Sequence, residues 1–216
     1  MDGDEASGES REPEDEAIAA ARRRGEIAIA GRSGAEQIVR RFLDADDAKT
    51  RLAALAALVR MERAGPPDIA LLLADPDAGT RRSACELAAK VPGSSVRALL
   101  EDGDARVVEA AAFAVGELED LAAVPRLAEI ARDHADPLCR ESAVAALGAL
   151  GDERGRAAVL EALGDAPAVR RRAVVALAAF PGDEVEEALR RRLDDRDWQV
   201  RQSAQDVLGL TDEEPS

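Results

Sequence analysis

A pattern that recurs six times at nearly constant spacing is the feature that most constrains how this chain folds. Each copy is centred on an anchor residue, with Asp four residues before it in five copies and Ala three residues after it in all six. The anchors are Arg51, Arg81, Val108, Arg140, Arg170 and Arg201, which are 30, 27, 32, 30 and 31 residues apart. Self-similarity at such a period indicates a repeat array, in which each unit is buried by its neighbours.

Each copy contains two amphipathic segments. After the anchor, apolar residues at positions +3, +6, +7 and +10 form one stripe of a helix with 3.6 residues per turn. Pro or Gly then interrupts the chain, as at Pro92-Gly93, and a second segment follows, here with Val96, Leu99 and Leu100. With one Trp, three Phe and no Tyr, the core must consist mainly of Ala, Leu and Val, which suits closely packed helices better than strands.

We therefore predict an all-α fold, an α-solenoid of about six helix pairs plus an N-terminal capping helix. The solenoid is expected over residues 13–210, with 13–30 as the capping helix. Residues 1–12 have almost nothing to bury and are expected to form a disordered acidic tail. Residues 211–216 are expected to be a second disordered tail.

The repeat signature resembles a known family. Its clearest copy, Asp136–Gly148, reads Asp-Pro-Leu-Cys-Arg-Glu-Ser-Ala-Val-Ala-Ala-Leu-Gly, which resembles the short HEAT repeat of phycobilisome-lyase-type proteins. The resemblance covers about four-fifths of the chain. It implies a right-handed α-solenoid, an armadillo/HEAT-like superhelix. In such a solenoid the Arg-bearing helix of each pair lines the concave surface and the second helix forms the convex one.

The resemblance also implies a ladder in which each Asp caps a helix and each anchor Arg pairs along the stack. The Asp residues well placed as N-caps, worth ~1 kcal/mol each, are Asp47, Asp77, Asp104, Asp136 and Asp197. The third copy has Val108 in place of Arg, and the fifth has Ala166 in place of Asp, with Asp165 one residue early. We expect a local gap in the ladder at these two copies.

The charge of the chain bears on its partners and location. A formal net charge of −15 argues against nucleic acid binding, which requires a basic face that neutralises phosphates. The chain has no run of 18 apolar residues that suggests a membrane span and no signal-peptide pattern, so we expect a cytoplasmic protein. The excess of Arg over Lys is typical of a GC-rich bacterial gene. We expect a monomer with no nucleic acid or membrane partner.

Few side chains suggest catalysis or a cofactor. His134 is the only histidine and is expected in a solvated loop, with a general base or metal ligand as the alternative. Cys85 and Cys139 stand 54 residues apart, and two buried thiols explain them better than a metal site does. Acidic clusters at 44–47 and 194–197 could bind a cation, but helix caps and turns also explain them. We therefore expect no enzyme activity, no metal and no cofactor.

The open side of the anchor-bearing helices is the expected binding surface. Positions +1, +5 and +8 lie opposite the apolar stripe, and small residues at +8 predict a shallow groove. The candidate partner-binding residues on this concave face are Arg82, Glu86, Glu109, Phe113, Glu141, Arg171 and Asp206. Phe113 either anchors a partner or is covered by its neighbours. Trp198 is expected to be a packing residue. The Arg run at 170–172 is expected to be a solvated face with one member that belongs to the ladder or lies along the surface.

These features predict a non-catalytic HEAT-repeat scaffold or adaptor that binds a protein or peptide on its concave face, such as one with a basic segment. The alternative, by analogy with chromophore lyases, is a lyase or lyase subunit, although no placed acid or nucleophile supports it. DNA-base repair would require a cationic groove with aromatic residues, which this composition does not supply.

Overall fold

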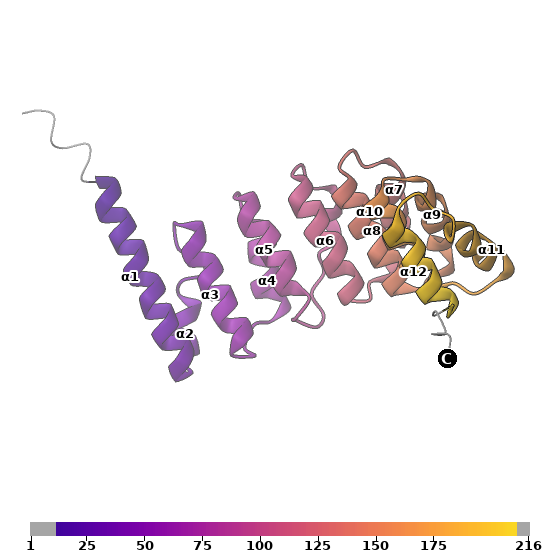
Figure 1. Cartoon of the computed structure of the whole chain (residues 1–216). Helices are drawn as coiled ribbons and strands as arrows, with labels where there is room; N and C mark the ends of the chain where they lie inside the picture. The colour runs from indigo at the N-terminus through magenta and orange to yellow at the C-terminus, as the bar shows by residue number, and fades with distance from the viewer. Residues whose placement is uncertain (1–11, 211–216) are drawn as a thin grey trace, which may run out of the picture. The chain divides into compact units, whose positions relative to one another are not determined.

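The computed structural model describes residues 12–210, and all of the regular secondary structure in that range is helical (Figure 1). Twelve α-helices and five short 3-10 helices follow one another there without a strand, which confirms the predicted all-α class. The predicted disordered tails, 1–12 and 211–216, lie outside the described residues, apart from Glu12, at which α1 begins. Within the described part of the chain, no helix is long and apolar enough to cross a membrane.

The chain divides into two compact units, of which the first is Met1–Ser94. Its helices are α1 (Glu12–Ser33), α2 (Glu36–Arg40), α3 (Ala48–Arg60), α4 (Pro66–Leu73) and α5 (Ala78–Ala88). α1 packs on α2 and α3 and buries Ile27 and Ala30, as expected of the capping helix. The anchor-bearing helices α3 and α5 pack on each other, and α4 packs on both.

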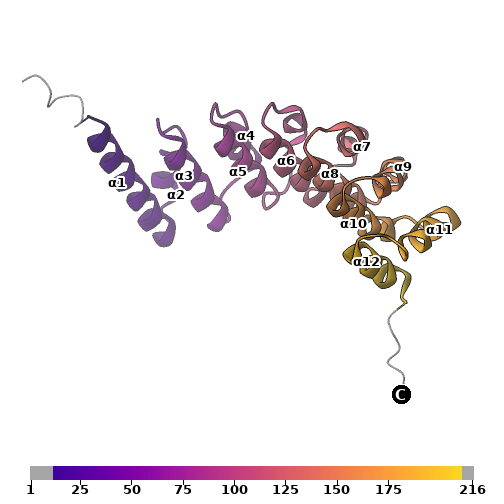
Figure 2. The same cartoon turned by 45° about the horizontal axis from the view of Figure 1, so that its top comes forward.

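The second unit is Ser95–Ser216 and consists of two layers of helices. One layer holds the anchor-bearing helices α6 (Ala105–Glu117), α8 (Pro137–Leu150), α10 (Pro167–Ala176) and α12 (Trp198–Leu208), each packed on the next (Figure 1). The other holds η1 (Arg97–Glu101), α7 (Val124–Asp133), α9 (Arg156–Glu161) and α11 (Asp183–Arg192) (Figure 2). Short 3-10 helices connect them: η2 (Leu121–Ala123), η3 (Glu153–Gly155), η4 (Ala162–Gly164) and η5 (Leu177–Ala179).

One predicted amphipathic helix is shorter and tighter than expected. The segment with Val96, Leu99 and Leu100 forms the 3-10 helix η1 instead of an α-helix. Val96 and Leu100 are nevertheless buried, as the pattern predicts. The segment ends at Asp102-Gly103, and a run this short gains few α-helical hydrogen bonds for the residues it must order, which favours 3-10 geometry.

The five predicted Asp caps are confirmed. In each, the carboxylate accepts a hydrogen bond from a backbone N–H two or three residues later, at 2.7–2.9 Å. The capping residues are Asp47, Asp77, Asp104, Asp136 and Asp197. The fifth copy has Ala166 at this position without a side-chain cap, and Pro167 begins the helix instead. Pro suits this position because the first N–H of a helix has no partner to lose.

Small residues let the anchor-bearing helices approach closely. The Ala residues at +3 are fully buried in all six copies: Ala54, Ala84, Ala111, Ala143, Ala173 and Ala204. At +8, a Cβ added to Gly148 would lie 2.6 Å from the Cβ of Ala176 and 2.7 Å from its Cα. Gly116 at the same position is buried beside Ala146. At +8, Gly116 and Gly148 therefore contact the next helix as well as the open face, which corrects the expectation that these two positions are simply solvent-facing.

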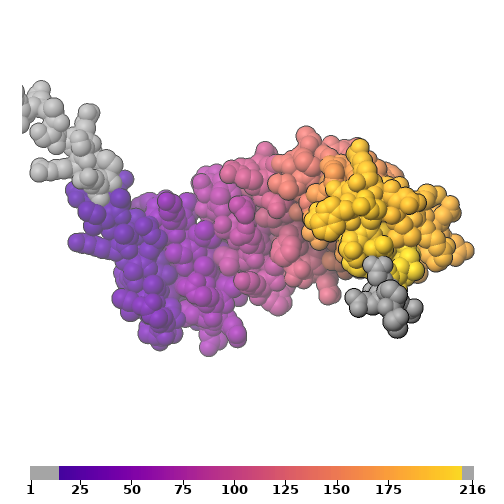
Figure 3. Space-filling view, viewed as in Figure 1, coloured from indigo at the N-terminus to yellow at the C-terminus, as the bar shows by residue number. Residues whose placement is uncertain are grey.

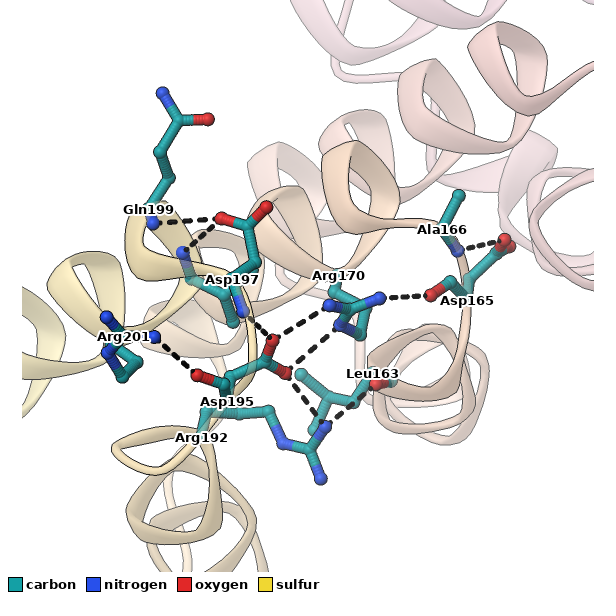
Figure 4. A network of polar contacts seen from close by, with 10 residues as sticks. Leu163, Asp165, Ala166, Arg170, Arg192, Asp195, Asp197, Gln199 and Arg201 are labelled. Atoms are coloured by element: carbon teal, nitrogen blue, oxygen red, sulfur yellow. Dashed lines mark hydrogen bonds and ion pairs between the residues drawn. The ribbon is translucent and has the colours of Figure 1, made fainter.

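The ladder exists, but its acidic members are not the capping residues. Arg170 donates from Nε and Nη2 to Asp195 at 3.0 and 2.8 Å, and Asp195 stands two residues before the cap Asp197 (Figure 4). Asp195 in turn accepts from the N–H of Asp197 at 2.9 Å. Arg51 pairs with Asp75 in the same way, at 2.6 and 2.9 Å. Arg51 and Arg170 thus each join their own helix to the loop before the next anchor-bearing helix.

The expected gap at the fifth copy is wrong. Arg140 donates to Asp165 at 2.6 and 2.7 Å, and the backbone carbonyl of Asp165 accepts from Arg170 at 2.7 Å. At the third copy Val108 cannot make an ion pair, and the loop residue two before the next cap is His134 instead of Asp. Its Nδ1 accepts from the N–H of Asp136 at 3.1 Å. At this copy the loop therefore keeps the hydrogen bond from the backbone N–H of the capping Asp136, which His134 accepts, but the Arg–Asp ion pair of the ladder is missing because Val108 has no guanidinium.

Candidate binding groove

A hollow of about 400 Å³ lies over α6 and α8, on the side predicted to be concave. It brings together three of the predicted partner-binding residues, Glu109, Phe113 and Glu141. We call it the α6–α8 hollow; the other residues that line it are Gly116, Glu117, Leu138, Ser142, Ala145, Ala146, Ala149 and Arg172. Positions +1 and +5 of neighbouring helices meet here, because they stand opposite the buried stripe.

The hollow combines apolar and acidic surface. Phe113 is 54% exposed and Leu138 is 58% exposed, so the alternative that neighbouring side chains cover Phe113 is wrong. Glu109 and Glu117 come from α6 and Glu141 comes from α8, which gives the hollow three carboxylates. A partner segment in which a large apolar side chain stands next to a basic one complements such a surface.

A second hollow of about 400 Å³ lies over α8 and α10. This α8–α10 hollow is lined by Ala145, Gly148, Ala149, Arg172, Val175, Ala176, Ala178 and Ala179. Val175 is 49% exposed and occupies position +5 of α10, as Phe113 does in α6. The two hollows share Ala145, Ala149 and Arg172, and we call them together the groove.

Arg172 is the groove residue that sequence reasoning missed. Its Nη2 lies 3.3 Å from Oε1 of Glu141, and its side chain is 44% exposed against 18% for Glu141. The run 170–172 was expected to be a solvated face with one member in the ladder or lying along the surface, and its members do have separate environments. Arg170 is buried in the ladder, whereas Arg172 lines both hollows. The sequence offered one signal for this role: Arg172 lies two residues after the anchor Arg170, next to position +1, where candidate binding residues were predicted.

The other predicted residues do not line the groove. Arg82 and Glu86 form an exposed ion pair of 3.2 Å on α5, in the first unit. Arg171 on α10 donates to Gln199 at 3.0 Å, and Asp206 on α12 accepts from Gln202 at 3.0 Å. These four residues stay candidate contacts, each already engaged with a neighbour.

Trp198 is not the packing residue that we expected. Its side chain is 65% exposed at the first position of α12, a helix that lies at the surface (Figure 3). The buried residues of α12 are Val200 and Ala204. Residue 198 precedes Val200 by two positions, which turns its side chain away from the buried face of the helix.

The chemically reactive side chains have structural roles. His134 is half-buried and accepts from a backbone N–H, as described above. Cys139 is buried, its Sγ donates to the carbonyl of Ala105 at 3.1 Å, and burial raises the pKa of its thiol to about 11. Among the described residues, no group of three or more His, Cys, Asp and Glu is placed to hold a metal ion.

Family models and solved structures match this chain. A model described as HEAT repeats matches residues 65–148 and 93–168, and one described as PBS lyase HEAT-like repeat matches 169–195. None of the curated proteins matches the chain in sequence.

Three solved structures are similar in fold. A designed armadillo repeat protein in complex with the peptide (KR)4 is 18% identical, with 81% of this chain and 98% of that chain covered and a TM-score of 0.58. An engineered protein is 21% identical over 81% and 96% of the two chains, with a TM-score of 0.60. Computationally designed armadillo repeat proteins for modular peptide recognition are 18% identical over 82% and 99%, at 0.55. The fold is therefore that of armadillo-type helical solenoids.

Proposed function

Because this chain is a HEAT-repeat protein, with a PBS lyase HEAT-like repeat at residues 169–195, we propose that it is a non-catalytic scaffold that binds a protein or peptide segment in the groove. The observation that carries the proposal is the α6–α8 hollow, in which the exposed ring of Phe113 stands with three carboxylates. Exposed rings are rare in a chain with 2% aromatic residues. A ring in such a concavity is the kind of anchor that dominates binding energy at interfaces.

The preferred segment contains Lys or Arg. Glu109, Glu117 and Glu141 give the hollow a negative field, which attracts cationic side chains and speeds their encounter. The proposal is supported by the similar designed armadillo protein, which was solved with the peptide (KR)4.

The non-catalytic part of the proposal rests on the reactive side chains. Nδ1 of His134 and Sγ of Cys139 are both engaged in hydrogen bonds to the backbone. The raised pKa of Cys139 keeps its sulfur protonated, and a thiol is a poor nucleophile compared with a thiolate. Both groups serve the fold in this arrangement.

The proposal also places the protein in the bacterial cytoplasm as a monomer without nucleic acid partners. The net charge of −15 supports the last point, since phosphate backbones repel such a chain. Light scattering coupled to size exclusion tests the oligomeric state, and a mass of about twice 22.8 kDa contradicts the monomer.

Binding of a fluorescent octapeptide of alternating Lys and Arg, followed by anisotropy, tests the proposed function. We expect wild-type protein to bind this peptide and not an octapeptide of alternating Asp and Glu. The double substitution Glu109→Lys and Glu141→Lys should weaken binding at least tenfold, and the loss should shrink as salt is raised, because screening weakens the field. Phe113→Ala should raise the dissociation rate with little dependence on salt.

The matched control is Glu129→Lys with Glu161→Lys, which changes the net charge equally but lies on α7 and α9 in the other layer. Circular dichroism and thermal melts check that each variant is folded. Equal weakening by both double variants would mean that net charge, and not the groove, attracts the peptide. Absence of binding by the wild-type protein contradicts the preference for a basic segment.

A further inference from the structure

We propose that Arg172 determines the specificity of the groove, and that it selects a segment in which an acidic side chain follows the basic ones on the α10 side. This inference rests on the proposed function, because it concerns the same groove. A uniformly acidic groove would select basic residues alone, whereas a groove with Arg172 selects a segment with basic and acidic residues in a set order.

The charge of the groove reverses along its length. The α6–α8 hollow contains three carboxylates, Glu109, Glu117 and Glu141. The residues that line the α8–α10 hollow, all in the described part of the chain, are Ala, Gly and Val apart from Arg172. A segment that crosses α6, α8 and α10 in turn therefore passes from a negative field to a single guanidinium.

Arg172 occupies the point where the two hollows meet. In the unbound protein its Nη2 lies 3.3 Å from Oε1 of Glu141, so it partly neutralises the carboxylate that a basic side chain would contact. The Arg172 side chain is 44% exposed, and ion pairs exposed to this extent contribute little. A Lys or Arg of the bound segment can thus replace Arg172 at Glu141 with little loss.

The displaced guanidinium then needs a new anion. Arg presents two parallel N–H donors that match a carboxylate, and pairs of this geometry are stronger than single hydrogen bonds. An acidic side chain of the segment on the α10 side supplies that partner next to the exposed Val175. After the exchange, Glu141 pairs with a basic residue of the segment and Arg172 pairs with an acidic residue of the segment. The two side chains no longer pair with each other.

The spacing of the two charges follows from the helix layer. Packed helices lie roughly 8–10 Å apart, and an extended chain advances about 3.3 Å per residue. A basic residue at Glu141 on α8 is therefore followed, about three residues later, by the acidic residue at Arg172 on α10. A segment of four basic residues, a Gly-Ser spacer and two Glu residues has this pattern.

Three fluorescent octapeptides test the inference by anisotropy. The first has four basic residues, Gly-Ser and two Glu; the second replaces both Glu residues by Gln; the third has the composition of the first with its charges intermixed. Wild-type protein should bind the first about twofold to fivefold more tightly than the second and the third, the range that one exposed ion pair supplies. A chain with net charge −15 would otherwise repel the two added Glu residues.

Arg172→Ala gives the decisive comparison, because only one of its two effects differs between the peptides. It frees Glu141 for the basic residues of both peptides, but it removes a partner from the Glu residues of the first peptide alone. It should therefore tighten the second peptide and reverse the order of the two affinities. The control Arg132→Ala removes another exposed ion-paired Arg, on α7, and should keep the wild-type order.

The outcomes separate this inference from the proposed function. A wild-type protein that binds the Gln peptide as tightly as the Glu peptide, or an unchanged order in Arg172→Ala, overturns the role of Arg172 while peptide binding stands. Failure of all three peptides and of the Lys-Arg octapeptide overturns both. Preference for the first peptide that is lost only in Arg172→Ala supports the inference.

Discussion

The guanidinium of Arg170 on α10 makes two hydrogen bonds to the carboxylate of Asp195, which lies 25 residues later in the loop before α12, and both side chains are only 4% exposed. The same guanidinium donates from Nη1 to the backbone carbonyl of Asp165. One side chain therefore joins its own helix to the loops on both sides of it (Figure 4). This arrangement explains how consecutive anchor-bearing helices of the second unit keep their register.

Loss of the buried pair should strongly destabilise the second unit. Arg170→Met leaves the carboxylate of Asp195 buried without its main partner, which costs about 3–5 kcal/mol. Urea denaturation followed by circular dichroism measures this change. The control Arg97→Met removes the half-exposed partner of Asp120 and should cost less than about 1 kcal/mol. Equal effects of the two substitutions would contradict a special role for burial of the pair.

The stability that the ladder contributes should depend on pH in the acid range. The hydrogen bond from Arg170 lowers the pKa of Asp195, and that from Arg140 lowers the pKa of Asp165, in each case against the opposing effect of burial. A carboxyl with a lowered folded-state pKa stabilises the fold above its unfolded pKa, about 3.9 for Asp. That contribution is lost as the pH falls through the lower folded-state value.

We therefore expect the free energy of unfolding of the wild type to exceed that of Asp165→Asn by a constant amount from about pH 7 to about pH 5. The difference should narrow below about pH 4. Urea midpoints at these pH values measure it. A difference that grows as the solution becomes more acidic has the wrong sign for an ion-paired carboxylate.

Two Gly-to-Ala substitutions should have opposite effects on the stability of the fold. Gly148→Ala places a Cβ 2.7 Å from the backbone Cα of Ala176, so the helices must separate, at a cost of about 1–3 kcal/mol or more. Gly25 lies within α1 with no atom within 4 Å of an added Cβ, so Gly25→Ala should stabilise by up to about 1 kcal/mol through helix propensity. Thermal melts of both variants check the two signs.

The buried Ala at +3 should not accept a larger side chain. Ala143 is fully buried in α8, and Ala143→Leu should cost about 1–3 kcal/mol through overpacking. Ala149, on the same helix, is exposed at the groove, and Ala149→Leu should leave the melting temperature nearly unchanged. If Ala143→Leu melts at the wild-type temperature, the assignment of this position to the helix seam is wrong.

Both thiols should be unreactive in the folded protein. Cys85 and Cys139 are buried, and the pKa of Cys139 is raised to about 11, so little thiolate forms near pH 8. Ellman's reagent should titrate close to no thiol before unfolding and two per chain in urea. Fast reaction of one thiol in the native protein would indicate an activated cysteine and reopen the question of catalysis.

Several features of the fold and groove follow from the sequence alone because the interactions behind them are local. Asp136 caps its helix through a backbone N–H two residues away, so composition and spacing are sufficient to place the cap. The buried phase of each helix follows from a 3.6-residue period, which correctly placed Ala143 inside and Phe113 outside. The same phase brought Glu109 and Glu141 into one hollow with Phe113.

Only the tertiary structure decided how side chains far apart in sequence meet. Sequence reasoning expected a gap at the fifth copy, but Arg140 in the first turn of α8 pairs with Asp165, 25 residues later, in the loop before α10. It also expected Trp198 to be a packing residue, which is wrong, and it did not foresee that the exposed side chain of Arg172 lines the groove. The direction of a long side chain depends on the neighbouring helix, on the cap that begins its own helix and on the space between them. A repeat sequence determines its period and its buried face, whereas the packed layer decides which charges pair and which remain open to a partner.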